Sequence, residues 1–373
     1  MLRVLVVDDS PTARALIAAI LSNDDKLTIA GEASSGHEAV EMTAQLRPDV
    51  ITMDIHMPGM GGFDATKQIM IDTPTPIVIV SASTMVDEVA LGMRALRAGA
   101  LTLLNKPPGP EAANYEEACS DLVDTVKSMA DVKVVRHVRS SQSEMPLGTT
   151  EGSDSSEPAN EDWSAASHGD PVFGPRVSDA SSVRGIIAIA ASTGGPPAIQ
   201  QVLANLPADF SLPILVVQHI AKGFSDGFTQ WLDSTVALPV TTAQVGVPLS
   251  VGQVYVAPEE GHLGVSQSRA IEISDSPPIA GFRPSASYLF NSVARVYRDA
   301  ALAVIMTGMG SDGLDGLRVV KQSGGTVIAQ DEATSVVFGM PGAALQAKIV
   351  DDTVRLDQIA GKIQQFELRQ TSR

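Results

Sequence analysis

The sequence predicts an α/β protein with two doubly wound parallel sheets, and three observations indicate this fold class. Short apolar runs alternate with helical patterns from residue 1 to about 126. The same alternation returns from about 184 to 366, and a stretch rich in Ser and acidic residues separates the two parts. Apolar runs closed by Gly or Pro are typical of buried parallel strands. A chain of 373 residues also exceeds one ordinary core, so two domains are expected.

The first part, residues 1–126, reads as a strand followed by a helix five times over, which predicts a doubly wound parallel sheet. The strand candidates that stand out are Arg3–Val7, Val50–Met53, Pro76–Val80 and Leu101–Leu104. Helical patterns are clearest at Thr12–Leu21 and Val86–Ala98. We expect this part to fold as one domain.

Residues 127–183 are expected to form a flexible acidic linker. Between Ser140 and Ser182 the chain holds eleven Ser and eight Asp or Glu, but one Arg and few large apolar residues. Such a segment buries too little surface to offset the entropy lost on ordering. A role in docking or as a phosphorylation segment is the alternative interpretation.

The last part, residues 184–366, predicts a second, mainly parallel α/β domain. Its strand candidates are Gly185–Ala191, Leu212–Val217, Val254–Ala257, Ala301–Met306 and Thr326–Ala329. Two further runs, Leu263–Val265 and Ala270–Ile273, predict a small antiparallel hairpin.

Composition and charge argue against several classes of protein. The formal net charge of −17 disfavours nucleic acid and anionic membrane surfaces as partners, because both attract clustered Lys and Arg. Cys119 is the single cysteine, which excludes an internal disulfide framework and fits a reducing compartment. The apolar runs are far shorter than the ~20 residues of a membrane-spanning helix. The first residues do not resemble a secretory signal, so we expect a soluble cytoplasmic protein without membrane insertion.

Polar residues follow the predicted strands of the first domain at one edge of its sheet. They are Asp8 and Asp9 after the run Arg3–Val7, Asp54 after Val50–Met53, Ser81 after Pro76–Val80 and Lys106 after Leu101–Leu104. Three carboxylates this close repel one another unless a hard cation lies among them, and Mg²⁺ also leaves coordination positions for phosphate oxygens. Lys106 and Ser81 are suited to bind a phosphate, and an aspartate can itself accept a phosphoryl group. Acids that merely accumulate in solvated loops are the alternative explanation.

The first domain resembles the response-regulator receiver family, which has a flavodoxin-like fold. The matching residues are Leu5 to Ser10, Met53 to Met60, Ser81 to Ser83 and Lys106-Pro107. The resemblance implies phosphorylation of Asp54 by a histidine kinase. It also implies Mg²⁺ held by Asp8, Asp9, Asp54 and the His56 backbone carbonyl, with Ser81 and Lys106 as the phosphorylation switch.

Three strands of the second domain each lead to a residue that a nucleophilic hydrolase needs. Ser192 follows the first, His219 the second and Asp312 the fourth. Because the carboxyl ends of parallel strands share one edge, these residues predict a catalytic triad there. The glycines after Ser192 also suit a dinucleotide-binding loop or simple helix packing, although the motif G-x-G-x-x-G is absent.

The base and the acid of this triad have competitors in the sequence. Beyond residue 184 only His219 and His262 can supply an imidazole, and His219 lies closer to its strand. Asp312 competes with Asp315 and Asp331. The flexible glycine-rich backbone just before Asp312 favours it, because such backbone offers free N–H groups for an oxyanion.

The second domain resembles the chemotaxis protein-glutamate methylesterase family. The matching residues are Ala191 to Pro196, Gln218-His219, Arg283 to Ser285, Thr307 to Gly313 and Gln330 to Ser335. The resemblance implies Ser192 as nucleophile, His219 as general acid and base, Asp312 as its partner, and an oxyanion hole of the Thr193 and Met309 backbone N–H groups. One departure is Ser287, where family members usually carry Asp, and the long acidic linker is another.

The two resemblances together imply a phosphorylation-activated enzyme of chemotaxis. We expect it to demethylate glutamate γ-methyl esters and to deamidate selected glutamines on methyl-accepting chemoreceptors, with a histidine kinase as phosphodonor. The esterase reaction is expected to need no cofactor, and the protein is expected to be a monomer. A receiver-gated peptidase or general esterase, a non-enzymatic adaptor and a DNA-binding output are the rival interpretations.

Overall fold

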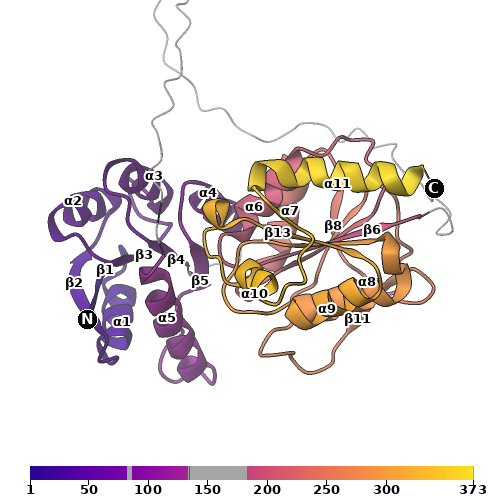
Figure 1. Cartoon of the computed structure of the whole chain (residues 1–373). Coiled ribbons are helices and arrows are strands. Elements are labelled where there is room, and N and C mark those ends of the chain that lie inside the picture. The colour runs from indigo at the N-terminus through magenta and orange to yellow at the C-terminus, as the bar shows by residue number, and fades with distance from the viewer. Residues whose placement is uncertain (82–85, 133, 135–182, 373) are drawn as a thin grey trace, which may run out of the picture.

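A computed structural model describes residues 1–81, 86–132, 134 and 183–372 of the chain, and Figure 1 shows their arrangement. The first domain holds a five-stranded parallel sheet in the order β2-β1-β3-β4-β5. Its strands are β1 Leu2–Val7, β2 Leu27–Ala33, β3 Val50–Met53, β4 Ile77–Ser81 and β5 Thr102–Asn105. Its helices are α1 Pro11–Ser22, α2 Gly36–Leu46, α3 Gly62–Asp72, α4 Val86–Arg97 and α5 Tyr115–Ala130.

Helices cover both faces of this sheet, which confirms the doubly wound prediction. Buried residues of α2, α3 and α4 pack on one face, while α1 and α5 pack on the other. The chain runs from β1 to β2 on one side and then returns to β3 on the other. The edge beyond β1 and β3 is therefore the switch point at which open parallel sheets bind ligands.

Helix α5 continues to Ala130, so the expected domain end at residue 126 falls inside this helix. Most of the expected linker, residues 127–183, lies outside the described residues.

The second domain is built on a seven-stranded parallel sheet in the order β14-β13-β12-β6-β7-β9-β8. Its strands are β6 Ile186–Ala191, β7 Ile214–Gln218, β8 Val240–Thr242, β9 Val254–Val256, β12 Ala301–Ile305, β13 Thr326–Gln330 and β14 Asp352–Val354. Its helices are α6 Gly195–Ala204, α7 Ser225–Thr235, α8 Ala286–Tyr297, α9 Leu314–Gln322, α10 Met340–Gln346 and α11 Leu356–Thr371. Two short 3₁₀ turns, η2 Arg298–Ala300 and η3 Glu332–Thr334, join these elements.

Side chains of the central strands alternate between two cores. In β6, Ile187 and Ile189 pack with α6, α7 and α11, whereas Ala188 and Ala190 pack with α8, α9 and α10. Figure 1 shows the first group of helices above the sheet and the second group below it. The antiparallel pair β10 His262–Val265 and β11 Ile271–Ser274 confirms the predicted hairpin.

The two domains touch through α4 and β5 of the first domain (Figure 1). Met93 and Leu96 of α4 belong to the same buried cluster as Phe228 of α7 and Ile199 of α6. Two hydrogen bonds join the domains here: the Gly194 N–H donates to the Leu101 carbonyl at 3.2 Å, and Asn105 Nδ2 donates to the Lys222 carbonyl at 2.7 Å. The first domain therefore contacts the loops that follow β6 and β7. None of the helices described is long and apolar enough to cross a membrane.

Candidate functional site

The loops after β6, β7 and β12 meet at the switch point of the second sheet. The chain leaves β6 toward β7 on one side and later returns to β12 on its other side, so these three strands are neighbours. The Ser192 N–H donates to the Thr307 carbonyl at 3.0 Å, and the His219 N–H donates to the Ala191 carbonyl at 3.0 Å. Ser192 therefore lies between the loop after β12 and the loop after β7.

Ser192 and His219 continue two paired strands in the same register. Ala191 pairs with Gln218, so the next residues along are Ser192 and His219. Adjacent strands lie about 4.8 Å apart. By alternation, Ser192 follows Ala188 and Ala190 on the α8 side of the sheet, and His219 follows Leu215 and Val217 on that same side.

His219 is hydrogen-bonded to Asp312, and the other nitrogen of its ring is free. Its Nε2 lies 3.0 Å from Asp312 Oδ2, and its side chain is only 9% exposed. Nδ1 is buried and has no hydrogen-bond partner among the described residues. In particular, no hydrogen bond joins the Ser192 hydroxyl to the His219 ring in the described structure. Phe282 stacks on the imidazole, with ring centroids 4.2 Å apart, and so covers one face of it.

Asp312 is buried and accepts several hydrogen bonds besides that of His219. The Ser285 hydroxyl donates to Oδ1 at 2.8 Å, the Ala286 N–H donates to Oδ2 at 2.7 Å, and the Ser287 N–H donates to Oδ1 at 3.2 Å. These donors lie at the start of α8, and the Gly313 N–H adds another at 2.8 Å. The carboxylate is therefore held in one orientation toward His219.

The pKa of Asp312 is lowered to about 2. Burial alone would raise it, but the hydrogen bond and charge of His219 outweigh burial, aided by the Ala286 N–H and the Ser285 hydroxyl. Asp312 is thus ionised at neutral pH, which suits a group that orients an imidazole and stabilises it when protonated.

The competing residues have other partners. The His262 ring is fully buried, its Nδ1 accepts the Ser285 N–H at 3.1 Å, and its Nε2 lies 3.2 Å from the Pro277 carbonyl. Asp315 is exposed and pairs with Arg318. Asp331 caps the η3 turn by accepting the Thr334 N–H.

Two backbone N–H groups in the loops at Ser192 have no acceptor in the described part of the chain. Neither the Thr193 N–H nor the Met309 N–H donates a hydrogen bond to any residue that the structure describes. Gly308, which precedes Met309, packs so closely that a Cβ there would lie 2.8 Å from the Ser192 Cβ. The loop after β12 is therefore in contact with the serine, as an oxyanion site requires.

The polar residues of the first domain also gather at its switch point. Carboxylate oxygens of Asp8, Asp9 and Asp54 lie within 4.8 Å of one another. Asp8 and Asp54 are buried, and Lys106 Nζ bridges them at 2.7 Å and 3.0 Å. The Ser81 hydroxyl is buried without a hydrogen-bond partner among the described residues. A cluster of hard oxygen donors beside one ammonium fits Mg²⁺ and a phosphoryl group.

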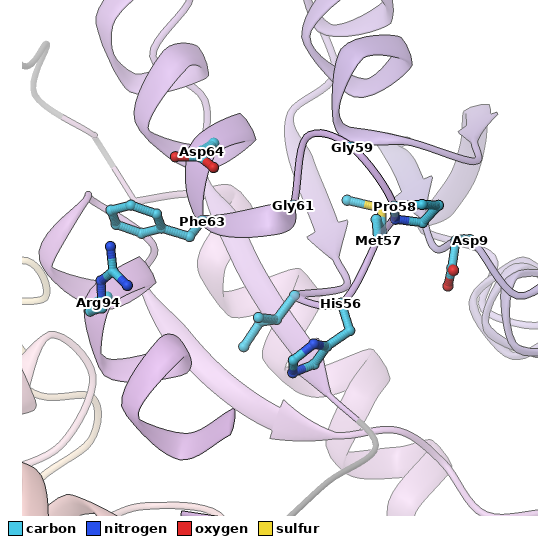
Figure 2. Close-up of a pocket in the computed structure, with 10 residues that line it drawn as sticks. Asp9, His56, Met57, Pro58, Gly59, Gly61, Phe63, Asp64 and Arg94 are labelled. Atoms are coloured by element: carbon cyan, nitrogen blue, oxygen red, sulfur yellow. The ribbon is translucent and has the colours of Figure 1, made fainter. Parts of the chain in front are cut away.

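The pKa of Asp54 is raised. Burial is the largest cause, and the nearby Asp8 carboxylate adds to it, while Lys106 and the His56 N–H act in the opposite direction. A hollow beside this cluster is lined by residues of the β3–α3 loop (Figure 2). In Figure 2, Phe63 and Arg94 lie on one side of the hollow and Asp9 on the other, so Asp9 is the carboxylate of the cluster that lines the hollow.

The sequence predictions assigned no supporting role to three residues that the structure places around the site. Ser285 holds Asp312, and the Ser287 hydroxyl accepts the Gly313 N–H at 2.9 Å. Gln218 donates to the carbonyls of Ser192 and His219. Ser285 and Gln218 stand inside the motifs that carried the family resemblance, but no local pattern shows what a side chain will contact after folding.

Comparison with known proteins gives the same two parts. The response regulator receiver domain matches residues 4–113, and the CheB methylesterase domain matches residues 187–363. The protein-glutamate methylesterase/protein-glutamine glutaminase 4 of Myxococcus xanthus is 47% identical over 97% of this chain and 96% of its own length. The protein-glutamate methylesterase/protein-glutamine glutaminase 3 of Anaeromyxobacter dehalogenans is 44% identical over 97% of this chain and 98% of its own length.

A solved structure is similar to the second domain. The Thermotoga maritima CheB methylesterase catalytic domain is 38% identical, with a TM-score of 0.47, and the match covers 49% of this chain and 98% of that one. By the identity and coverage of the curated relatives, the chain belongs to the CheB methylesterase family and carries a response regulator receiver domain.

Proposed function

We propose that the chain hydrolyses glutamate γ-methyl esters on methyl-accepting chemoreceptors, and deamidates selected glutamines, when its receiver domain is phosphorylated. The observation that carries the proposal is the His219–Asp312 hydrogen bond at 3.0 Å, one strand away from Ser192. The family membership adds the substrate class, because the relatives are named for both activities. The proposal divides the chain into a receiver at 1–126, a linker at 127–183 and a catalytic domain at 184–366.

In the proposed mechanism, Ser192 Oγ attacks the ester carbonyl while the free nitrogen of His219, Nδ1, takes its proton. The scheme requires the Ser192 side chain to rotate so that its hydroxyl reaches this nitrogen. Asp312 holds the ring and stabilises the imidazolium, and the N–H groups of Thr193 and Met309 bind the oxyanion. Methanol leaves with the proton from His219.

Water then attacks the glutamyl–serine ester with His219 as base, which releases glutamate and restores Ser192. Deamidation follows the same course with ammonia as the leaving group. No step of this scheme calls for a cofactor, because Ser192, His219 and Asp312 carry the bond making and proton transfers and the Thr193 and Met309 N–H groups bind the oxyanion.

In the proposed regulation, a chemotaxis histidine kinase transfers a phosphoryl group to Asp54. Asp8, Asp9, Asp54 and the His56 carbonyl would hold Mg²⁺, which supplies charge neutralisation for the transfer. Ser81 and Lys106 would bind the phosphoryl oxygens. Lys106 bridges Asp8 and Asp54, so a new phosphate there competes for its ammonium and rearranges this edge of the sheet.

The signal would reach the catalytic domain through β5. Lys106 directly follows β5. Asn105, at the end of β5, and Leu101, just before its start, each form a hydrogen bond to one of the catalytic loops. A tenfold activation needs about 1.4 kcal/mol of differential stability. In this proposal the protein acts as a cytoplasmic monomer without membrane insertion.

The test is methanol release from methylated receptor membranes, with and without a small-molecule phosphodonor. We expect wild type to respond to the phosphodonor, Ser192→Ala to lose nearly all turnover in both conditions, and Asp54→Asn to keep a basal rate that does not respond. Turnover by Ser192→Ala at the wild-type rate would refute the triad. Cleavage of generic peptides without any methanol release would indicate a peptidase instead.

A further inference from the structure

Gln218 is a buried amide at the end of a strand whose inward positions are otherwise apolar. Ile214 and Val216 of β7 pack in the core formed with α6 and α7, and Gln218 is the next residue on that side. It is only 5% exposed. Its Nε2 donates to the Ser192 carbonyl at 2.8 Å and to the His219 carbonyl at 2.7 Å.

The oxygen of this amide has no partner in the part of the chain that the structure describes. Gln218 Oε1 is buried and accepts no hydrogen bond from any residue that the structure describes. An unsatisfied buried acceptor lowers the stability of the folded protein. The favourable contribution of the Gln218 amide therefore comes from the two hydrogen bonds that Nε2 donates. A Cβ at Gly195 would lie 2.0 Å from Gln218 Oε1, which is a steric clash. The amide fits at this position because residue 195 is a glycine.

The Ser192 carbonyl belongs to the same peptide unit as the Thr193 N–H. In a trans peptide the C=O and N–H bonds point in opposite directions. A donor that holds the carbonyl from one side therefore fixes where the N–H points on the other. Hydrogen bonds also polarise one another in chains, so a bonded carbonyl makes the N–H of its peptide a stronger donor.

The second proposed oxyanion donor has the same arrangement. The Met309 N–H shares its peptide with the Gly308 carbonyl, which accepts the Gly339 N–H at 3.0 Å and the Met340 N–H at 2.9 Å. At the Ser192–Thr193 peptide one of the two donors is likewise a backbone group, the Gly195 N–H at 2.8 Å, and the other is the Gln218 amide. The Gln218 amide is the side-chain member of this pair.

We propose that Gln218 is a positioning residue for the esterase reaction, which orients and polarises the Ser192–Thr193 peptide so that its N–H stabilises the oxyanion. The inference rests on the proposed function of Ser192. Gln218 acts through the backbone and touches neither the substrate nor the catalytic nitrogen of His219. Its loss should therefore lower the rate of the chemical step and leave substrate binding and the basicity of His219 unchanged.

The test compares Gln218→Leu and Gln218→Glu with wild type. We expect kcat for methanol release to fall about 10- to 100-fold in both, since a misplaced donor costs less than a deleted one. KM should stay within about twofold in both, and in Gln218→Leu, which adds no charge, the pH at half-maximal kcat/KM should not move. The control is Gln200→Leu, which replaces another buried glutamine, in α6, whose amide bonds among the described residues only to the Thr235 carbonyl. It should keep the wild-type kcat.

A second measurement separates this inference from the proposed function. A fluorophosphonate reacts with an activated serine through the same oxyanion geometry and needs no receptor. If wild type labels at Ser192 but releases no methanol, the substrate assignment fails, and the labelling rate of the Gln218 variants still decides the inference. Labelling and kcat within twofold of wild type in either folded variant, judged by thermal unfolding, would overturn it. A shifted pH profile in Gln218→Leu would also overturn it, because it would assign Gln218 to the base.

Discussion

Asp312 is the residue whose environment in the proposed triad is most tightly defined. It is buried, ionised, and accepts hydrogen bonds from a hydroxyl, from three backbone N–H groups and from His219. Such a carboxylate cannot turn away from the imidazole without losing all of these donors. It therefore fixes which nitrogen of His219 carries the proton and which stays free for Ser192.

Replacing Asp312 by Asn should lower kcat by about 10⁴-fold, because an amide can stabilise the wrong tautomer of His219 and cannot stabilise the imidazolium. Steady-state methanol release measures the effect. Asp315→Asn is the matched control, since Asp315 is exposed and its only described ion pair is with Arg318. We expect it to be as active as wild type. A loss of less than tenfold in Asp312→Asn would contradict the assigned role.

Asp312 should also make stability depend on pH in the acid range. Its pKa is about 2 in the folded state and 3.8 for an unperturbed Asp, so the unfolded state binds the proton more readily. The stabilisation is complete above about pH 4 to 5 and is lost as pH falls through 2. The shift corresponds to about 2 kcal/mol.

Urea unfolding of wild type and Asp312→Asn between pH 5 and pH 2 measures this contribution. The difference in unfolding free energy between the two proteins should shrink by about 2 kcal/mol as the pH is lowered. A difference that stays constant over this range would show that the carboxylate is not selectively stabilised in the folded state.

At the scale of elements, the site depends on a close approach between the β12 loop and the β6 turn. A Cβ at Gly308 would lie 2.4 Å from Met340 Sδ and 2.8 Å from Ser192 Cβ. No rotamer change of one flexible side chain relieves both contacts, because one of them involves the Cβ of the serine itself. The loop carrying the Met309 N–H must therefore move if position 308 acquires a side chain.

Gly308→Ala should destabilise the protein by about 1–3 kcal/mol, as overpacking does, and should also lower kcat. Gly361→Ala is the control, because Gly361 lies within α11 and a Cβ there meets nothing within 4 Å. It should stabilise the protein by about 0.5–1 kcal/mol through helix propensity. Thermal unfolding and methanol release test both variants, and equal stability of the two would contradict the packing argument.

The elements that could be predicted from the sequence are those with strong local patterns. Strands β6 and β12 are apolar runs buried on both faces, as are residues 4–7 of β1 and 214–217 of β7, and these runs predicted the four strands. Three strands were not located by any such run. The middle of β2 is only half-buried, and β8 and β14 are three residues long at the edges of the sheet. Short or half-exposed strands carry little periodic signal.

The positions of Ser192, His219 and Asp312 were predictable for a similar reason. Each follows a buried strand, and parallel strands deliver such residues to one edge. The contacts of Ser285 and Gln218 were not predictable, because they depend on where α8 and α6 begin after the whole sheet has formed. Sequence pattern predicts which residues come together at an edge, whereas packing decides which of them support the others.

At the scale of the whole molecule, the receiver is joined to the catalytic domain where the catalytic loops are. The Leu101 carbonyl bonds to Gly194, two residues after Ser192, and Asn105 bonds to Lys222, three residues after His219. A movement of β5 would therefore displace the backbone close to both Ser192 and His219. The Lys222 bond is made by a side chain, so it can be removed without changing the main chain.

Asn105→Ala should raise the turnover of the unphosphorylated protein about 2- to 10-fold, since one hydrogen bond is worth about 0.5–1.5 kcal/mol. Methanol release without phosphodonor measures this basal rate. Asn114→Ala is the control, because Asn114 is exposed at the start of α5 and makes no side-chain capping bond. A basal rate unchanged by Asn105→Ala would indicate that this bond does not restrain the enzyme.

The placement of β6 at the middle of its sheet has a consequence for how the chain is synthesised. One edge of β6 pairs with β7, which emerges from the ribosome soon afterwards, but its other edge waits for β12. Until β12 has been translated, the nascent chain exposes the unpaired side of an entirely apolar strand, which is a template for aggregation. The strand order that creates the switch point at Ser192 thus also leaves one edge of β6 unpaired during synthesis. Until β12 is made, this edge must be protected from aggregation.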